Sequence, residues 1–402
     1  MKTKGMRTLG LYVHIPFCVR KCHYCDFLSF SATEEVKEQY VQALCKEIIS
    51  FKEEETSCMV TTIFFGGGTP SILKGEQMER IMKAIKETFY IDENAEITIE
   101  MNPGTVTKEK LEQYKRIGIN RLSIGLQTTD DNRLQLLGRI HTYEQFLNNY
   151  QWAREVGFQN ISVDLMSALP KEEIASYQKD LERIVALNPE HISSYSLIIE
   201  EGTPFYDNDE ILHSLPKEEE DRAMYELTQT LLQKAGYHRY EISNYAKEGK
   251  ESRHNSIYWT GGEYLGLGLG ASSYLLADHA YIREPREKEH YAYRFKNISS
   301  MEDYIKCPMT PCEEREEWTL IGKTEAMEEF MFLGLRMRKG ISEEEFLNKF
   351  GLELEEVYGN VLVKFQTMGL LGWTGEKKKR QIYLTDQGID VSNAILSEFL
   401  LT

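Results

Sequence analysis

The first half of the chain alternates short apolar runs with longer amphipathic stretches, and this pattern limits the fold more than any other feature. Six runs rich in β-branched or aromatic residues lie at 9–15, 61–67, 96–102, 121–127, 161–166 and 192–198. Stretches between them, such as 34–51 and 76–90, repeat apolar residues at helical spacing. Near-continuous apolar strands separated by helices are typical of a parallel sheet covered on both faces. We therefore predict an α/β fold in which residues 1–240 form an open or partial (βα)6 TIM-like barrel.

The pattern changes after about residue 240, where Tyr and Gly become frequent. We expect an accessory region over 241–318 that ends in a charged connector. Over 319–402 the predicted order is helix, turn, two helices, strand, turn, strand and a last helix, which is similar to a winged helix. Many winged helices bind DNA, but the second helix here, 343–350, contains three glutamates. We therefore interpret 319–402 as a winged-helix-like domain for packing or partner docking.

Three cysteines, Cys18, Cys22 and Cys25, stand in the segment CVRKCHYC directly after the first predicted strand. The CxxxCxxC spacing places three thiols on one loop, which suits an iron–sulfur cluster whose fourth iron stays open to a small molecule. The alternative is a zinc site completed by His14 or His23. Structural zinc sites usually use two separated pairs of ligands, and no second CxxC follows here. We therefore favour the iron–sulfur interpretation.

Composition limits the compartment and the partners. The seven cysteines are an odd number and only the first three are clustered, which disfavours the disulfide framework of a secreted protein. No apolar window approaches about 18 residues, and no secretory leader is visible. The net charge of −17 disfavours a broad nucleic-acid surface, because such surfaces depend on Lys and Arg. We expect a cytoplasmic protein with no stable membrane insertion and no nucleic-acid partner.

A glycine run, GGGTPS at 66–71, follows the second predicted strand. It permits close approach of the backbone to a ligand, and it lacks the GK[ST] ending of a phosphate loop. Together with HIPF and CxxxCxxC, this run resembles the radical S-adenosylmethionine (SAM) superfamily. The resemblance implies a [4Fe–4S] cluster whose open iron binds the amino and carboxylate groups of SAM. Reduction of such a cluster can cleave SAM to a 5′-deoxyadenosyl radical.

The similarity extends over nearly the whole chain to the coproporphyrinogen dehydrogenase-like (HemN-type) branch, which contains oxygen-independent coproporphyrinogen III oxidases and heme chaperones. The resemblance implies that the methionine part of SAM is surrounded by Tyr12, Gly67, Gly68, Thr69 and Glu100. It implies that the ribose or carboxylate end is faced by Gln127, Arg139 and Asp164. These residue types are suitable, because a carboxylate accepts from ribose hydroxyls and a guanidinium clamps a carboxylate. Each also has a structural alternative as a hydrogen bond at the barrel rim. Tyr24 is expected to shield the cluster and stack near adenine, or only to pack the loop.

Two features separate the branches. In the oxidases the corresponding pattern is CxxxCxxCxC. Here Phe27 stands at the position of the fourth cysteine, and only 17 residues precede Cys18. In addition, HNSIYW at 254–259 resembles the HNxxYW motif of the heme chaperones. That resemblance implies that His254 ligates heme iron while Tyr258 and Trp259 stack on the macrocycle. On the residues alone, a histidine beside aromatics is more often structural.

The resemblance therefore favours a heme chaperone. It implies a protein that binds a [4Fe–4S] cluster, SAM and heme as cargo, and that passes heme to acceptor hemoproteins, which we expect to be respiratory. An electron donor and a homodimer are further expected partners, and SAM cleavage would be gating or slow side chemistry. The alternative is an oxygen-independent coproporphyrinogen III oxidase, which decarboxylates its substrate to protoporphyrinogen IX. A radical SAM enzyme for an unrelated substrate is a third hypothesis.

Overall fold

Six parallel strands form the centre of the protein, as the sequence predicts. The computed structural model describes residues 6–53, 58–282, 290–307 and 315–401. The strands follow one another in the sheet in chain order, each parallel to the next. They are β1 (Arg7–Ile15), β2 (Cys58–Gly67), β3 (Ile91–Met101), β4 (Arg121–Gln127), β5 (Ile161–Ser167) and β6 (His191–Ser196). Because parallel neighbours end on the same edge, the segments after these strands meet at one mouth.

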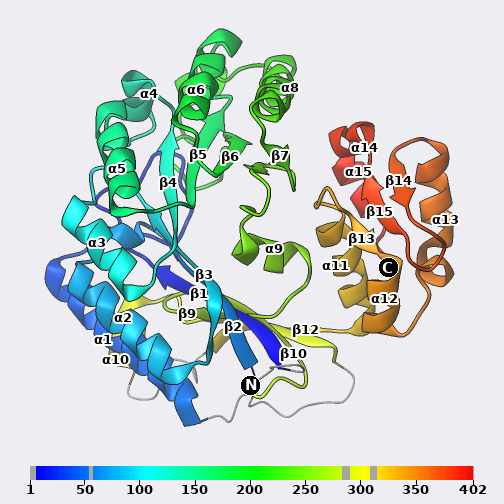
Figure 1. Ribbon diagram of the computed structural model, residues 1–402, viewed down its shortest axis with the longest axis horizontal. Coiled ribbons are helices and arrows are strands. Elements are labelled where there is room, and N and C mark those ends of the chain that lie inside the picture. The colour runs from blue at the N-terminus through cyan, green and yellow to red at the C-terminus, as the bar shows by residue number, and fades with distance from the viewer. Residues whose placement is uncertain (1–5, 54–57, 283–289, 308–314, 402) are drawn as a thin grey trace.

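Helices cover the outer face of this curved sheet (Figure 1). The longer ones are α1 (Glu34–Ser50), α2 (Gly75–Thr88), α3 (Lys108–Ile117), α5 (Tyr143–Val156), α6 (Ile174–Leu187) and α8 (Glu218–Lys234). Short segments add η1 (Phe51–Glu53), η2 (Pro70–Ile72), α4 (Asp131–Leu136) and α7 (Asp209–His213). Threonines 33, 107 and 142 begin α1, α3 and α5, and each side chain accepts a hydrogen bond from a first-turn N–H. Such caps satisfy backbone donors that have no partner within the helix.

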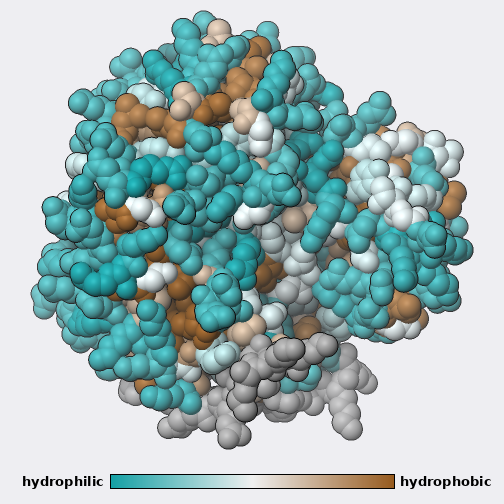
Figure 2. Space-filling view, viewed as in Figure 1, coloured by the Kyte–Doolittle hydropathy of each residue, from teal (hydrophilic) through white to brown (hydrophobic). Residues whose placement is uncertain are grey.

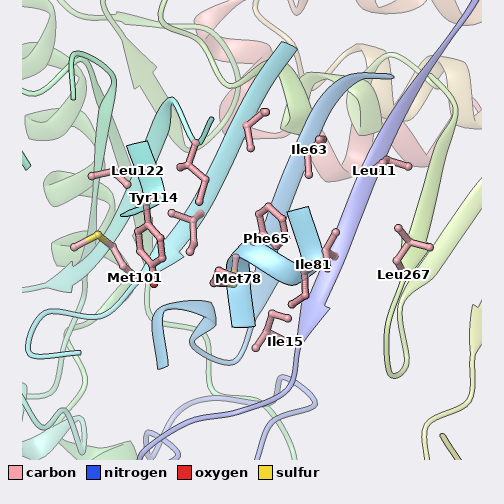
Figure 3. Packing of buried hydrophobic residues seen from close by; sticks show 14 of the residues in the cluster. Leu11, Ile15, Ile63, Phe65, Met78, Ile81, Met101, Tyr114, Leu122 and Leu267 are labelled. Carbon is pink, nitrogen blue, oxygen red and sulfur yellow. The ribbon is translucent and has the colours of Figure 1, made fainter. Parts of the chain in front are cut away.

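The main hydrophobic core lies between the sheet and these helices. Ile63 and Phe65 of β2 are fully buried with Ile81 of α2, and Tyr114 of α3 belongs to the same cluster (Figure 3). Burying one such side chain stabilises the fold by about 1.5–3 kcal/mol. Alternate residues of a strand point to opposite faces, so Thr62 and Phe64 face the inside of the barrel. The outward residues pack against the helices, and the inward residues are available to form the site.

The region 241–318 extends the same sheet. At one edge, β9 (Tyr264–Leu267) pairs parallel with β1, and β10 (Ser272–Leu276), β11 (Ala292–Asn297) and β12 (Arg315–Ile321) follow antiparallel. At the other edge, β8 (Asn244–Ala246) and β7 (His238–Arg239) follow β6. Helix α10 (Met301–Lys306) follows β11. The two ends of the sheet, β12 and β7, do not pair, which confirms the partial barrel. The division at residues 240 and 318 stays a prediction.

The C-terminal part forms a smaller bundle with its own core, seen to the right in Figure 1. It contains α11 (Lys323–Gly334), β13 (Ile341–Ser342), α12 (Glu343–Phe350), α13 (Leu354–Thr367), β14 (Leu371–Thr374), β15 (Gln381–Leu384), α14 (Asp386–Asp390) and α15 (Ser392–Ser397). This order confirms the predicted winged-helix-like arrangement. The acidic start of α12 is paired with the hairpin, because Arg380 contacts Glu343 at 2.7 Å.

The surface agrees with the acidic composition. The face in Figure 2 is mostly hydrophilic, and apolar residues reach it only in separate patches. Among the helices that the structure describes, none is both long enough and apolar enough to cross a bilayer.

Candidate functional site

One pocket at the mouth of the barrel contains nearly all the residues expected around the cluster and SAM. Its lining includes Cys18, Cys22, Cys25, Tyr24, Gly67, Gly68, Thr69, Glu100, Gln127, Arg139 and Asp164. The pocket has about 730 Å³ of empty space, part of it open to solvent. Tyr12 is the exception among the expected residues. It lies inside the barrel, stacked on Phe64 at 6.3 Å, and its hydroxyl is 3.0 Å from His14 Nδ1.

The cysteine loop is fixed at its base. The Cys18 N–H donates to the Phe30 carbonyl and the Phe30 N–H to the Pro16 carbonyl, each at 3.0 Å. Farther along the loop, His23 Nδ1 lies 3.0 Å from the carbonyl oxygen of Leu136. These contacts hold the loop, and with it the thiols, against the pocket.

The thiols are unpaired and lie beside polar groups of other loops. Cys18, Cys22 and Cys25 form no disulfide. Cys18 Sγ is 3.5 Å from Thr69 Oγ1, and Arg139 Nη1 donates to Cys22 Sγ at 3.6 Å. Burial raises the pKa of Cys25. No three His, Cys, Asp or Glu side chains within the described ranges converge on a single ion. A cubane cluster does not need that convergence, because each thiolate binds a different iron.

The glycine run after β2 leaves room that a side chain would fill. Gly67 has φ +112°, and a Cβ there would lie 2.5 Å from the His14 ring. A Cβ on Gly68 would lie 2.7 Å from the carbonyl oxygen of Phe17. The Thr69 N–H donates to that same carbonyl at 2.8 Å. The glycines therefore bring the backbone of this turn against the cysteine loop, as a cradle for a bound amino acid moiety requires.

Two partly buried carboxyl groups line the pocket. Glu100 Oε2 accepts from the Gly67 N–H at 3.2 Å. Burial and the nearby carboxyl of Asp164 raise the pKa of Glu100 to about 8. Asp164 lies near the hydroxyls of Ser123 and Ser162, at 3.3 and 3.4 Å, and burial raises its pKa as well. Such carboxyl groups are suited to hold an ammonium group and hydroxyls of a ligand.

Arg139 links several pocket loops. Its Nη2 donates to Asn102 Oδ1 and to the Gly125 carbonyl, while Asn102 Nδ2 donates to Thr69 Oγ1 at 2.8 Å. Its Nε is buried and has no hydrogen-bond partner among the described residues. Tyr24 lies beside this guanidinium, and burial raises its pKa. The guanidinium is thus held between the cysteine loop and the ends of β3 and β4.

The sequence interpretation missed several lining residues, including Arg20, Asn102, Ser123 and Tyr195. Asn102 belongs to the segment EMNP that already supplied Glu100. The Tyr195 hydroxyl donates to Gln127 Oε1 at 3.2 Å, and Gln127 itself has φ +79°. Tyr195 lies near the end of the sixth predicted strand. Parallel strands present their site residues at their carboxyl ends, so this position could have identified Tyr195 from the sequence.

The motif HNSIYW lies elsewhere. It forms α9 (Arg253–Trp259), which lies on the inner side of the sheet in Figure 1 and outside the pocket lining. His254 is fully buried, with Nδ1 2.8 Å from Thr62 Oγ1 and Nε2 2.9 Å from the Tyr258 hydroxyl. Burial lowers the pKa of His254 to about 3. Trp259 packs under the Arg336 guanidinium at 4.7 Å. The motif residues therefore do not line the pocket that contains the cysteines.

Comparisons with known proteins agree with this geometry. Residues 12–184 match the Radical SAM superfamily, and residues 321–391 match the HemN C-terminal domain. The fold and the pocket thus define a radical SAM protein, which implies a [4Fe–4S] cluster and SAM. Full-length relatives are heme chaperone HemW of Lactococcus lactis, at 36% identity over 97% of both chains, and of Bacillus subtilis, at 36% identity over 97% of this chain and 98% of the other. The chain belongs to the HemW family.

A solved structure has the same fold. Coproporphyrinogen III oxidase (HemN) from Escherichia coli, a radical SAM enzyme, aligns with a TM-score of 0.82 and 23% identity. The alignment covers 100% of this chain and 92% of that one. At this identity the likeness establishes the architecture, including the C-terminal domain, and leaves the chemistry to the residues of the site.

Proposed function

We propose that this protein is a heme chaperone that carries a [4Fe–4S] cluster, binds SAM, and transfers heme to acceptor hemoproteins, respiratory ones in particular. Cys18, Cys22 and Cys25 would hold three irons of the cluster. The Gly67–Thr69 turn and Glu100 would hold the methionine part of SAM, while Gln127, Arg139 and Asp164 would face its ribose or carboxylate end. The cluster supplies one-electron reduction when it is bound. The thiols, carboxyl groups and guanidinium that line one pocket support this assignment.

One observation favours the chaperone over the oxidase. Phe27 stands where the oxidase pattern CxxxCxxCxC has its fourth cysteine. It lines the pocket and is 63% exposed. A phenyl ring supplies neither a metal ligand nor a proton. The full-length relatives named heme chaperone support the same choice. The alternative, an oxygen-independent coproporphyrinogen III oxidase, draws support from the shared fold with HemN.

Heme contact by His254, Tyr258 and Trp259 stays a prediction. In the present arrangement both ring nitrogens of His254 have partners at hydrogen-bond distance. Ligation of iron by Nε2 would require Tyr258 to swing its hydroxyl away. An electron donor, a homodimer and a cytoplasmic location complete the proposal, and Cys45 and Cys58, which form no disulfide, support a reducing compartment.

The test is anaerobic purification with cluster reconstitution, followed by two parallel assays. We expect hemin to bind, as followed by its absorbance, and to move to an apo-hemoprotein, whereas coproporphyrinogen III with SAM and reductant gives no product. Stoichiometric protoporphyrinogen formation would overturn the chaperone assignment. The triple change Cys18→Ala, Cys22→Ala and Cys25→Ala should abolish the iron–sulfur absorbance. Cys45→Ala, on α1, is the matched control and should retain it.

A further inference from the structure

Two of the three thiols assigned to the cluster are joined to each other by polar side chains. Cys18 Sγ lies 3.5 Å from Thr69 Oγ1, and Arg139 Nη1 donates to Cys22 Sγ at 3.6 Å. Asn102 lies between them, since its Nδ2 donates to Thr69 Oγ1 at 2.8 Å and its Oδ1 accepts from Arg139 Nη2 at 2.5 Å. The three residues Thr69, Asn102 and Arg139 are the thiol network, and they line the main pocket together with the thiols.

The direction of each hydrogen bond in the thiol network follows from the guanidinium. A guanidinium has only donors, so the amide oxygen of Asn102 faces Arg139 and its NH2 group faces Thr69. The Thr69 oxygen therefore accepts from Asn102, and its own proton points to Cys18 Sγ. A thiolate that binds iron has no proton to give, so the Thr69 hydroxyl is the donor of that pair. Each of the two sulfurs thus has one donor from the thiol network.

Asn102 is held by its backbone as well as by its side chain. Its N–H donates to Ser71 Oγ at 3.3 Å, and its carbonyl accepts from the Thr105 hydroxyl at 2.7 Å. Thr69 is 2% exposed, which leaves water little access to its hydroxyl and strengthens the hydrogen bonds that it makes. Asn102 therefore stands at a fixed place from which it orients a donor toward each sulfur.

We propose that the thiol network raises the reduction potential of the cluster, and that Asn102 is the positioning residue that aims its donors. This inference rests on the proposed function, because it concerns the cluster held by the three cysteines. Reduction adds negative charge to the cluster, so hydrogen bonds to its sulfurs become stronger and favour the reduced state. A higher potential puts the cluster within reach of a weaker electron donor. A network that only braced the loops would leave the potential unchanged.

The test uses the reconstituted full-length protein without SAM, so that contacts of Thr69 and Arg139 to SAM play no part. Thr69→Val removes the hydroxyl at nearly constant volume, Thr69→Ser restores it, and Asn102→Leu removes the link between the other two residues. None of these variants changes a charge. Thr98→Val is the matched control, because Thr98 is fully buried on β3 and its hydroxyl has no hydrogen-bond partner among the described residues.

Potentiometric titration followed by electron paramagnetic resonance of the reduced cluster measures the midpoint potential. Iron content and thermal unfolding verify the cluster and the fold. We expect Thr69→Val and Asn102→Leu to lower the potential, so that the ratio of reduced to oxidised cluster at one fixed ambient potential falls about three- to tenfold. Tenfold corresponds to about 59 mV for a one-electron couple. Thr69→Ser and Thr98→Val should keep the wild-type potential.

A wild-type potential in Thr69→Val with a full cluster would overturn the inference and leave the chaperone function in place. Failure of the wild type itself to assemble a cluster would instead overturn the proposed function. Asn102 reaches the thiols only through Thr69 and Arg139, so Asn102→Leu carries the test if Thr69→Val does not hold its cluster.

Resonance Raman spectra give a second measurement of the same hydrogen bonds. The iron–thiolate stretching bands of the wild type should shift between H2O and D2O, because exchangeable protons of Thr69 and Arg139 lie on the sulfurs. The shift should be smaller in Asn102→Leu. Equal shifts in the two proteins, or bands of the wild type that do not shift, would also overturn the inference.

Discussion

At the residue scale, the pocket depends on carboxyl groups kept in an unusual protonation state. Glu100 and Asp164 lie near each other, and two carboxylates cannot both ionise there without a counter-charge. The Gly67 N–H is the hydrogen-bond donor that the structure shows for Glu100. The raised pKa of Glu100 favours its protonated form near neutral pH, and a cationic ligand group beside it would favour the ionised form.

This protonation predicts how stability depends on pH. The pKa of Glu100 rises from 4.5 to about 8 on folding, so the native state holds the proton more tightly than the unfolded state. This contribution to the free energy of unfolding is fully present below the pKa of the unfolded state and is lost as pH rises through the pKa of the folded state. Relative to Glu100→Gln, the wild type should lose about 2–3 kcal/mol of unfolding free energy between about pH 6 and pH 8.

Urea unfolding of the apoprotein at several pH values checks this expectation. The control is Glu87→Gln, which removes one carboxylate from a side chain that is 51% exposed. A constant difference for Glu100→Gln would contradict the raised pKa.

At the element scale, helix α9 closes the inner side of the barrel. Glu96 of β3 accepts hydrogen bonds from the first N–H groups of the helix, those of Arg253 and His254, at 3.2 and 3.1 Å. A carboxylate at a helix N-terminus is favourable because it satisfies free donors and opposes the helix dipole. His254 also stacks on Phe64 at 5.1 Å. The helix is thus fixed to the sheet from its first turn.

The buried imidazole predicts a stability cost that is separate from heme binding. His254→Ala should lower the free energy of unfolding by about 2–4 kcal/mol, because it leaves a cavity and two hydroxyls, of Thr62 and Tyr258, without their partner. His238→Ala, at an exposed position paired with Glu251, should change it by less than about 0.5 kcal/mol. Chemical denaturation measures both variants. A His254→Ala protein as stable as the wild type would show that the imidazole has no packing role, and its hemin Kd would then report ligation alone.

At the scale of the whole molecule, α9 also contacts the C-terminal part. Trp259 at its end lies under Arg336, which follows α11, and Lys349 Nζ donates to the Thr260 carbonyl at 2.9 Å. The Arg338 N–H donates to the Tyr240 carbonyl at 2.9 Å, a further direct link between the two parts. The helix that fills the barrel is therefore also part of the interface with the winged-helix-like region.

A double-mutant cycle measures this contact. Arg336→Ala and Trp259→Leu should each destabilise the protein, and their combination should show a coupling energy of about 0.5–2 kcal/mol. The control cycle combines Arg336→Ala with Trp373→Leu, because Trp373 lies under a different guanidinium, that of Arg380. That pair should be additive. Additivity in the Arg336–Trp259 cycle would show that the cation–π contact does not join the two parts.

The sequence by itself determined the six parallel strands, because apolar periodicity is local and each run is long enough to specify a buried strand. It also determined the three thiols and most of the pocket lining, since the carboxyl ends of parallel strands must meet. Only the tertiary structure decided where the other residues lie. Tyr195 reaches Gln127, and His254 lies against Thr62 inside the barrel, outside the pocket lining. These positions depend on contacts between segments distant along the chain, and no local pattern encodes such contacts.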